Sequence, residues 1–422
     1  MSVESTEPDP FERFNRAQGQ GSVRSPYPRL AEWRRQAPLR RMQLEDMEPS
    51  VRMQGRILFR GELPPIFVAL SHDAVAEVLR DGERFSSQGY ARTIGLVMGH
   101  SILEMDEPEH SRSRGVIQQA FSKRALEHWE RDLVSPIVHG LIDRFASRGQ
   151  ADLVRELTFP FPVSVIAHML GLAEQDHADF HRLAVELISL AVDPAVGFAA
   201  SLKLRELFAR VLVERRSEPQ EDLISVLAHA ELDGLRLDDE AIFAFLRLLA
   251  PAGAETTYRS SSNLFFGLLS QPDQLDAVRR DRSLVPQAIE EGLRWECPLT
   301  GIQRTCTRDT LVQGVAIPAG AIVFVNMGAA NRDETRYERP DEFDIFRPVR
   351  THMAFAFGPH RCLGMHLARM ETRVVLEAVL DRLPNVRLDP EAKDPHITGE
   401  MFRSPLALPV LFGPTLEGKS RA

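Results

Sequence analysis

Cysteine is scarce in this chain, with three residues among 422: Cys297, Cys306 and Cys362. No two of them have the Cys-x-x-Cys spacing that structural zinc sites and redox dithiols use. So small a number also excludes a disulfide scaffold, because such folds depend on many paired cysteines. Unpaired thiols are typical of a reducing compartment, and we therefore expect a cytoplasmic protein.

An apolar leader and an excess of positive charge are also missing. The chain begins MSVESTEPDPFERF, a polar, proline-containing stretch that predicts neither a signal peptide nor a membrane anchor. Lysine and arginine number 51 against 60 aspartate and glutamate residues, which gives a net charge of −9. No global charge attracts nucleic acid or an anionic membrane, so any basic site must be local.

The remaining composition is that of a globular protein, because 43% of the residues are hydrophobic and 26% are charged. At roughly 150 residues per domain the length would allow two or three domains. The composition does not shift along the chain, however, and no internal repeat is evident. We therefore expect one large domain over residues 25–415, preceded by a flexible arm of residues 1–24 and followed by a tail of residues 416–422.

Helical periodicity dominates the predicted secondary structure. Apolar residues recur every three to four positions through most of the span 72–295, and helix returns after Gly364. Two β-prone runs at 55–59 and 65–70 predict an antiparallel pair, and a further β-rich stretch covers 310–325. The fold class expected is mainly α with small β-sheets at the margin, an α+β arrangement.

The most informative segment is residues 355–364, FAFGPHRCLG, which precedes an amphipathic helix. A cysteine at a helix N-terminus gains from the helix dipole and from free backbone N–H groups, and both favour the thiolate. Gly358 and Gly364 permit close approach of the backbone, and Pro359 stiffens the turn. A lone cysteine near two glycines is more often a buried apolar residue, but such a loop also suits a sulfur anion that binds a metal.

A long apolar helix is expected after Asp238, which can serve as its N-cap, and it should run for about 30 residues. Its middle, residues 251–257, reads PAGAETT. Pro251 removes a helical hydrogen bond and Gly253 weakens the next turn, so the helix should bend or open there. The interruption is either a tolerated kink, with Thr256 bonded back to a preceding carbonyl, or a functional feature.

The cysteine loop resembles the haem-binding signature of the cytochrome P450 family, in which Phe, Gly, His or Arg, Cys and Gly recur at these spacings. The resemblance implies the cytochrome P450 fold in one large domain and a haem b (iron protoporphyrin IX) held by the Cys362 thiolate as axial ligand. Ala356 stands where the family usually has glycine, and we expect a slight backbone adjustment there rather than loss of haem. The loop positions implied to bind the cofactor are Phe355, Gly358, His360 and Gly364.

Residues 252–256, AGAET, look like the oxygen-activation motif of the same family. The likeness implies that Ala252 borders the haem, that Thr256 helps to deliver protons and that Glu255 links the site to outside proton donors. Glutamate replaces the more frequent aspartate, which keeps the acid but lengthens its reach. The geometry of the relay is therefore less well defined than its chemistry.

Haem carries two propionates, so its pocket needs cationic or hydrogen-bonding side chains. His110 and Arg114 lie four residues apart on one face of a predicted helix, in the run MDEPEHSRSR of residues 105–114. This run resembles the family's Asp-x-Pro-Glu-His-x-x-x-Arg segment, whose His and Arg bind propionate. Arg304 and His360 match other propionate ligands. Each of these residues alone would more often be a solvated surface group.

Glu291 and Arg294 lie three residues apart on a predicted helix, where they can pair. One Glu-x-x-Arg is a weak motif, but here it resembles the family's buried ion pair, with Arg347 as the third member. The role implied is structural, because the group would hold the irregular segment that backs the haem loop.

A haem enzyme needs a cavity over the iron. By the resemblance its walls come from the loop after Phe85, the helices around Asp193, the central helix, the stretch after Pro298 and a late turn near Met401. Core packing explains each residue there about as well as substrate contact does. We expect an apolar substrate of moderate size, which could be a terpenoid, steroid, fatty acid or polyketide. The pocket residues implied are Leu96, Val97, Leu249, Ile302, Gln303, Met401 and Phe402.

The resemblance also implies a separate electron supply, either a ferredoxin with its reductase or a flavodoxin, because no such domain is fused to the chain. Residues 112–124 contain four cations and no acid. With Arg361 they would form a docking face for a small acidic donor, although a plain solvated face is an equally good explanation. A monomer without nucleic-acid or membrane partners is expected. The four cations are Arg112, Arg114, Lys123 and Arg124.

The sequence thus predicts a haem-thiolate monooxygenase that uses dioxygen and two supplied electrons to hydroxylate or epoxidise an apolar small molecule. The electron-rich Cys362 sulfur would favour O–O cleavage. One alternative is a peroxygenase driven by hydrogen peroxide, but the pair Glu255 and Thr256 argues against it because such enzymes need no oxygen-splitting proton relay. The other alternative is a non-catalytic haem-thiolate binding or recruitment protein.

Overall fold

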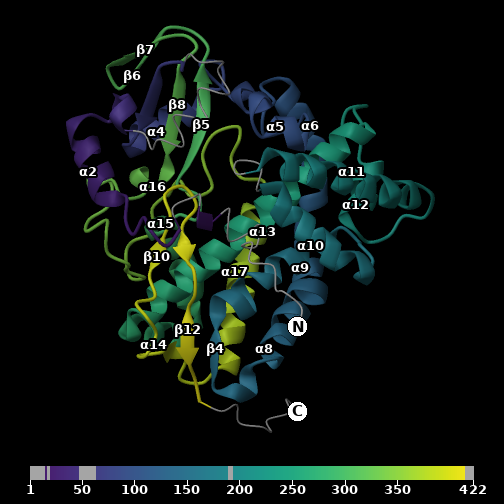
Figure 1. Cartoon of the computed structure of the whole chain (residues 1–422), viewed down its shortest axis with the longest axis vertical. Helices are drawn as coiled ribbons and strands as arrows, with labels where there is room; N and C mark the ends of the chain where they lie inside the picture. The colour runs from purple at the N-terminus through teal and green to yellow at the C-terminus, as the bar shows by residue number, and fades with distance from the viewer. Residues whose placement is uncertain (1–14, 17–19, 47–62, 189–192, 414–422) are drawn as a thin grey trace, which may run out of the picture.

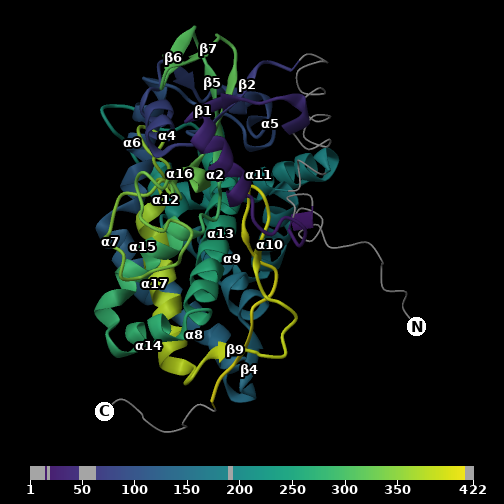
Figure 2. The same ribbon diagram turned by 90° about the vertical axis from the view of Figure 1, so that its left-hand side faces the viewer.

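The computed structural model describes residues 15–16, 20–46, 63–188 and 193–413 (Figure 1). Helices make up most of this chain, and the strands form small sheets (Figures 1 and 2). The sheet that contains β5 and β8 lies at one end of the molecule, and β4 and β12 lie towards the other. The predicted mainly α fold with small β-sheets is confirmed.

The helices and strands have the following bounds. The α-helices are α2 (Tyr27–Gln36), α4 (His72–Arg80), α5 (Gly95–Met98), α6 (Glu109–Gln118), α7 (Lys123–Trp129), α8 (Ser135–Asp143), α9 (Pro160–Met169), α10 (Glu174–Ile188), α11 (Pro194–Ser217), α12 (Leu223–His229), α13 (Asp239–Leu269), α14 (Pro272–Arg280), α15 (Val285–Trp295), α16 (Met327–Ala330) and α17 (Met365–Arg382). The strands are β1 (Leu39–Arg41), β2 (Ile66–Ala69), β3 (Phe85–Ser86), β4 (Gln150–Asp152), β5 (Gly301–Cys306), β6 (Thr310–Val312), β7 (Val315–Ile317), β8 (Ile322–Asn326), β9 (Arg387–Leu388), β10 (Ile397–Thr398), β11 (Ser404–Pro405) and β12 (Pro409–Leu411).

The largest sheet has the strand order β1-β2-β8-β5-β3, in which β2 and β8 are parallel and the other neighbours are antiparallel. The predicted run 65–70 becomes β2, which pairs with β1 and β8, whereas the run 55–59 lies outside the described residues. The β-rich stretch 310–325 is confirmed. Its hairpin β6–β7 turns at Gln313 and Gly314, which both have positive φ, as a tight two-residue β-turn requires.

The central helix α13 begins where the sequence predicts, because the Asp238 carboxylate caps it by accepting a hydrogen bond from the Ala241 N–H at 2.8 Å. It packs against α9, α11, α15 and α17, and from Ala254 onward nearly all of its residues are buried. The helix continues through Pro251, so of the two predicted outcomes the opening is wrong, while a bend stays a prediction. Dense packing on several sides stabilises the turn that proline weakens.

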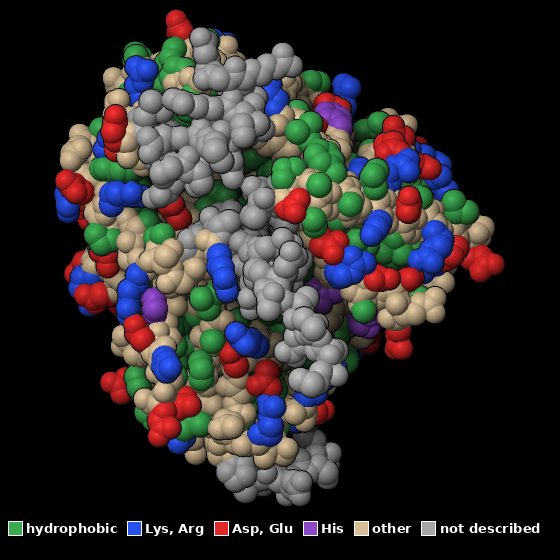
Figure 3. All heavy atoms as spheres, in the orientation of Figure 1, with side chains coloured by type: hydrophobic (Ala, Val, Ile, Leu, Met, Phe, Trp, Pro, Cys, Tyr) green, Lys and Arg blue, Asp and Glu red, His purple; other side chains and the backbone are tan. Residues whose placement is uncertain are grey.

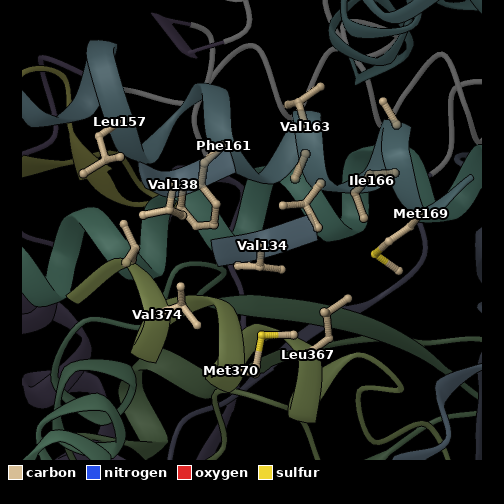
Figure 4. Close-up of a cluster of buried hydrophobic side chains, with 14 of the residues drawn as sticks. Val134, Val138, Leu157, Phe161, Val163, Ile166, Met169, Leu367, Met370 and Val374 are labelled. Atoms are coloured by element: carbon tan, nitrogen blue, oxygen red, sulfur yellow. The ribbon is translucent and has the colours of Figure 1, made fainter. Parts of the chain in front are cut away.

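The main hydrophobic core includes residues from Val97 to Phe412, in keeping with one large domain. Figure 4 shows part of it, where side chains of α8, α9, α17 and the helical turns beside them point toward one another. Among the described residues, no helix has the length and apolar character needed to cross a membrane. The labelled side chains are Val134, Val138, Leu157, Phe161, Val163, Ile166, Met169, Leu367, Met370 and Val374.

Most of the predicted arm, residues 1–24, lies outside the described residues, as does the predicted tail, residues 416–422. The described part of the arm is held against the body of the protein. Asn15 is buried, and its Oδ1 accepts a hydrogen bond from Arg259 Nη2 at 2.6 Å. Gln20 is also buried and donates to a serine hydroxyl of β11 at 2.9 Å.

Glu291, Arg294 and Arg347 meet as a buried charged group. Arg294 donates to the two Glu291 carboxylate oxygens at 2.7 and 2.8 Å, and Arg347 Nε lies 3.4 Å from Oε1. The side chains of Glu291 and Arg294 are only 5% and 3% exposed. Both arginines also donate to backbone carbonyls of the irregular segment 331–342. The group therefore ties α15 to the chain that leads into the cysteine loop.

Replacing Glu291 by Gln should lower the free energy of unfolding by about 3–5 kcal/mol, because two buried arginines would lose their carboxylate. Urea unfolding followed by circular dichroism measures the loss. Glu342→Gln is the matched control, since its ion pair with Arg339 is more than half exposed, and it should cost at most about 1 kcal/mol. Equal losses in the two variants would contradict a stabilising role for the buried group.

Candidate functional site

Cys362 lies in the loop 355–364, three residues before α17 begins. Its backbone N–H donates to the Phe355 carbonyl at 2.9 Å, and the Arg361 N–H donates to the Gly358 carbonyl at 3.1 Å. These two bonds close the loop across the cysteine. The Cys362 side chain is exposed, unlike those of the other two cysteines. The loop therefore presents a sulfur atom to an incoming ligand.

The two glycines of the loop have different roles. Gly358 has φ of +72°, and a Cβ there would lie 2.3 Å from the Leu79 carbonyl oxygen. Only glycine fits that position. A Cβ at Gly364 would meet no atom of the described chain within 4 Å, so no protein backbone approaches this glycine closely, and its place beside the cofactor stays a prediction.

Ala356 occupies the left-handed region of backbone space, with φ of +56°. Glycine adopts this conformation freely, whereas a side chain adds strain on the order of 1 kcal/mol. The departure from the family pattern is thus accommodated by local strain at one residue, while the loop keeps the turn that glycine would allow. The neighbouring bonds keep it there, since the Ala356 N–H donates to the Met353 carbonyl at 2.8 Å.

The surrounding protein by itself does not favour the thiolate form that the sequence predicts for Cys362. Desolvation by the surrounding protein raises the pKa of the thiol, although the side chain has exposed surface. The Gly364 N–H and the cations Arg114, Arg369 and Arg361 oppose this shift without cancelling it. A bound metal ion removes the proton from a coordinating thiol outright. The anion is therefore expected only when a metal is present.

Four predicted propionate ligands come together from three parts of the chain. His110 on α6 is buried, and its ring centroid lies 3.9 Å from that of His360 in the cysteine loop. Arg114, one turn further along α6, donates to the Arg361 carbonyl at 2.6 Å. Arg304 on β5 is buried and donates to the carbonyl of its neighbour at 2.8 Å. The structure thus gathers positive and hydrogen-bonding groups next to the cysteine loop.

The two arginines of this cluster have no ion-pair partner among the described residues, although His110 Nδ1 lies 3.2 Å from a Glu107 carboxylate oxygen. His110 Nε2 is buried without a hydrogen-bond partner, and neither Arg114 nor Arg304 has a carboxylate at ion-pair distance among the described residues. Burial, followed by the effect of Arg304, His110 and Arg114, lowers the pKa of His360 to about 3. A buried cation such as Arg304 requires compensation by an anion. The donor set therefore fits a ligand with two carboxylates, such as haem.

Glu255 and Thr256 are neighbours on α13, and their side chains take different partners. The Thr256 hydroxyl donates to the Ala252 carbonyl at 2.7 Å. The Glu255 carboxylate is buried and accepts from Arg259 Nε at 2.9 Å, and Arg259 Nη2 pairs with the same oxygen. Ala252 and part of Thr256 are exposed. Successive helical residues point about 100° apart, so only the alcohol and Ala252 share the accessible side.

Two of the predicted pocket regions lie side by side. Ile302 and Gln303 belong to β5, and Leu299 just before this strand forms a β-bridge with Phe402. This bridge brings the late turn, with Met401 partly exposed, next to the start of β5. Residues almost a hundred positions apart in the sequence thus form one wall.

The other predicted pocket residues lie on α5 and α13. Leu96 is 58% exposed on α5, whereas its neighbour Val97 is almost completely buried. Leu249 on α13 is partly buried against the main core. A Cβ at Gly99, just after α5, would lie 3.3 Å from the Ala244 side chain, so the end of α5 touches α13. Val97 is therefore a core position, and Leu96 faces outward.

Three contact residues were missed by sequence reasoning. Ser87 Oγ lies 3.2 Å from His360 Nε2, and a contact between residues 273 positions apart leaves no local signal. Arg259 holds Glu255, and Arg247 lies in the same helix. Arg247 interrupts an apolar stretch, and that signal in the sequence could have identified it, whereas Arg259 lies among polar residues and gives no such signal.

Comparisons with known proteins agree with this geometry. The profile of the family "Cytochrome P450" matches residues 197–409. The steroid C26-monooxygenase of Mycolicibacterium smegmatis is 36% identical over 355 residues, which cover 82% of this chain and 88% of that protein. The cytochrome P450 monooxygenase PikC of Streptomyces venezuelae is 34% identical over 382 residues, which cover 88% of this chain and 87% of PikC.

Solved structures have the same fold. Cytochrome P450 CYP109Q5 from Chondromyces apiculatus matches with a TM-score of 0.82 and 34% identity, over 93% of this chain and 96% of that one. CYP109E1 from Bacillus megaterium, in complex with testosterone, matches with a TM-score of 0.81 and 30% identity, over 92% and 99% of the two chains. This chain therefore belongs to the cytochrome P450 family and is one of its monooxygenases.

Proposed function

We propose that this monooxygenase binds haem b through Cys362 and hydroxylates or epoxidises an apolar small molecule. Cytochrome P450 proteins hold haem through a cysteine thiolate, and the bacterial members act on small molecules with the help of redox partners. The observation that carries the proposal is the exposed Cys362 thiol beside Arg114 and the buried Arg304, neither of which has a carboxylate at ion-pair distance among the described residues. Together these groups offer an axial ligand for iron and counter-charges for two propionates.

Haem, when bound, supplies the one-electron and dioxygen chemistry of the reaction. The chain's contribution begins at Cys362, whose proton leaves when the sulfur binds iron. The hydrogen bond from its N–H to the Phe355 carbonyl orients the loop. With haem bound, His110 Nε2, which lacks a partner in the described chain, together with Arg114, Arg304 and His360 would hold the propionates. A buried charge imbalance is relieved at the same time.

Thr256 is proposed to hold the proton that the oxygen chemistry consumes. Its hydroxyl now donates to the Ala252 carbonyl, and rotation about χ1 frees that proton for the exposed side of α13. Glu255 is proposed to resupply it. Because Arg259 holds the Glu255 carboxylate, this acid must first leave the ion pair before it can carry a proton. The rate of proton supply therefore depends on breaking the ion pair between Glu255 and the buried Arg259.

An apolar substrate agrees with the relatives. The protein from Mycolicibacterium smegmatis is named a steroid C26-monooxygenase, and the CYP109E1 structure is described as a complex with testosterone. The substrate is proposed to contact Leu96, Leu249, Ile302, Gln303 and the late turn with Met401 and Phe402. Val97 is buried in the core and is proposed to pack behind these residues without contacting the substrate.

Electrons are proposed to come from a separate ferredoxin and its reductase, or from a flavodoxin. Arg112 and Arg361 are exposed, and Lys123 is 91% exposed. Their positive charge would raise the association rate of an acidic donor in a chain of net charge −9.

The three unpaired cysteines support a cytoplasmic location. We further propose that the protein acts as a monomer.

The first experiment on the enzyme compares NADH with surrogate ferredoxin partners against hydrogen peroxide alone. Product formation that depends on NADH supports the monooxygenase. Turnover with peroxide only would favour a peroxygenase, and ligand binding without turnover under either condition would favour a recruitment protein.

Replacing Cys362 by Ala should abolish the thiolate-type Soret band of the reduced carbon monoxide complex, because no other described cysteine is exposed. Difference spectroscopy of the purified variant measures this band. Cys306→Ala is the control, since Cys306 is buried and its thiol donates to the Arg308 carbonyl. The control should keep the band, and its persistence in Cys362→Ala would exclude Cys362 as the ligand.

Replacing Thr256 by Ala should leave NADH oxidation running while the product falls several-fold and peroxide rises, because the proton-holding hydroxyl is lost. Product, peroxide and NADH are quantified in the same reaction. Thr256→Ser keeps the hydroxyl and should restore most of the coupling. The same coupling in the alanine variant as in the natural enzyme would remove Thr256 from proton delivery.

A further inference from the structure

Arg247 is a buried cation in the first half of α13. Its side chain lies in an apolar stretch of the helix and is only 7% exposed. Arginine stays charged under all ordinary conditions, and a buried charge is costly unless an opposite charge or several hydrogen bonds compensate it. Burial lowers the pKa of Arg247, in line with this cost.

The described chain satisfies Arg247 only in part. Its Nε donates to the Phe243 carbonyl at 3.2 Å and its Nη1 donates to Ser201 Oγ at 3.0 Å. Three of its five N–H bonds have no acceptor among the described residues. No carboxylate of the described residues lies at ion-pair distance from Arg247, and the nearby Glu240 carboxylate is paired with Arg205 instead.

The free end of the guanidinium is accessible. Nη2 is not among the enclosed, unpartnered polar atoms of the described residues. A Cβ at Gly99 would lie 2.7 Å from Nη2, so the absence of a side chain at that position leaves the nitrogen uncovered. Gly99 has φ of +86° and follows α5 directly. The fold thus leaves a fork of N–H donors open beside α5.

Arg247 also joins the elements that form the proposed substrate pocket. The Ser201 hydroxyl on α11, which accepts from Arg247, donates in turn to the Val97 carbonyl on α5. Residues of α5 and α13, namely Leu96 and Leu249, are in the proposed pocket. The cation therefore lies on one of the proposed pocket elements, α13, and is linked to another, α5, through Ser201 of α11.

The surroundings of this cation are apolar. Leu96 on α5 and Phe198 and Leu202 on α11 are exposed by 58%, 42% and 61%. Figure 3 shows apolar side chains gathered on the face over α5. An apolar surface with one unpaired cation below it matches a ligand that is apolar along its length and anionic at one end.

We propose that Arg247 binds the carboxylate of an apolar acid that the enzyme oxidises at a distant carbon. Arginine suits this task because its planar fork matches a carboxylate in a bidentate pair. Nine residues separate Arg247 from Thr256, which is about 13 Å along the helix axis. The substrate must therefore place its oxidised carbon about that far from the carboxylate. This inference rests on the proposed function, because it assumes that oxidation occurs beside Thr256.

The test compares each acid with its own methyl ester in the haem-loaded enzyme. Tetradecanoic acid represents a flexible chain and 5β-cholanic acid a rigid skeleton. Dissociation constants come from the low-spin to high-spin shift of the Soret band and from equilibrium dialysis. At least one acid should bind about 10- to 100-fold more tightly than its ester, the range expected for a hydrogen bond to a charged group. If neither acid exceeds its ester, the inference is wrong.

Variants then assign the preference to one residue. Arg247→Met should remove the advantage of the acid and leave ester binding unchanged, while Arg205→Met, an exposed arginine on α11 paired with Glu240, should change neither. Arg247→Lys, which keeps the charge and loses the fork, should retain part of the preference. An undiminished preference in Arg247→Met or Arg247→Lys would overturn the assignment, and should the methionine variant fail to fold, the lysine variant decides.

The outcomes for this inference and for the proposed function are separable. A thiolate-type carbon monoxide spectrum with equal binding of acid and ester refutes the carboxylate site and leaves the monooxygenase intact. Absence of that spectrum in the natural enzyme refutes haem ligation by Cys362, whatever the acids do in dialysis.

Discussion

The pair of arginines beside the cysteine loop, Arg114 and Arg304, is the constraint on which the rest of the structure depends, because neither has a carboxylate at ion-pair distance among the described residues. Arg114, Arg304 and two imidazoles are brought together by α6, β5 and the loop, yet no carboxylate of the described chain pairs with either arginine. The buried charge of Arg304 is costly until a ligand supplies an opposite charge. Binding of haem is therefore coupled to folding, because a ligand that binds only the native state stabilises it by mass action.

The central helix carries two buried arginines whose surroundings are opposite in kind. Arg259 is completely enclosed and paired with Glu255, Asn15 and a serine of β11, so its charge is satisfied within the protein. Arg247, three turns earlier, has no anionic partner in the part of the chain that the structure describes, and it keeps an accessible nitrogen. The first arrangement restrains the acid proposed to supply protons. The second leaves a charge that only a ligand can neutralise, and so it bears on which substrates the enzyme selects.

Local patterns predicted the parts of this site that depend on neighbours in the sequence. The cap at Asp238, the hairpin after Thr310 and the tight turn at Gly358 follow from single residue types and their spacing. The continuity of α13 through Pro251 could not be predicted, because it depends on packing against helices far along the chain.

The dependence on segments far along the chain also explains the errors at the site. The thiol at Cys362 keeps a raised pKa because distant segments desolvate it, although the helix N-terminus alone favours the anion. Two contacts were also beyond prediction. Ser87, the partner of His360, comes from another part of the sequence. Arg259, the partner of Glu255, is four residues away on the same helix, but helical spacing alone does not reveal that the pair is buried.

A crystal structure of the purified haem-loaded protein tests the central claim most directly. The account predicts that Cys362 Sγ is bonded to the iron and that His110 Nε2, Arg114 and Arg304 contact the propionates. Iron bound by any other residue, or propionates directed away from these cations into solvent, would contradict it.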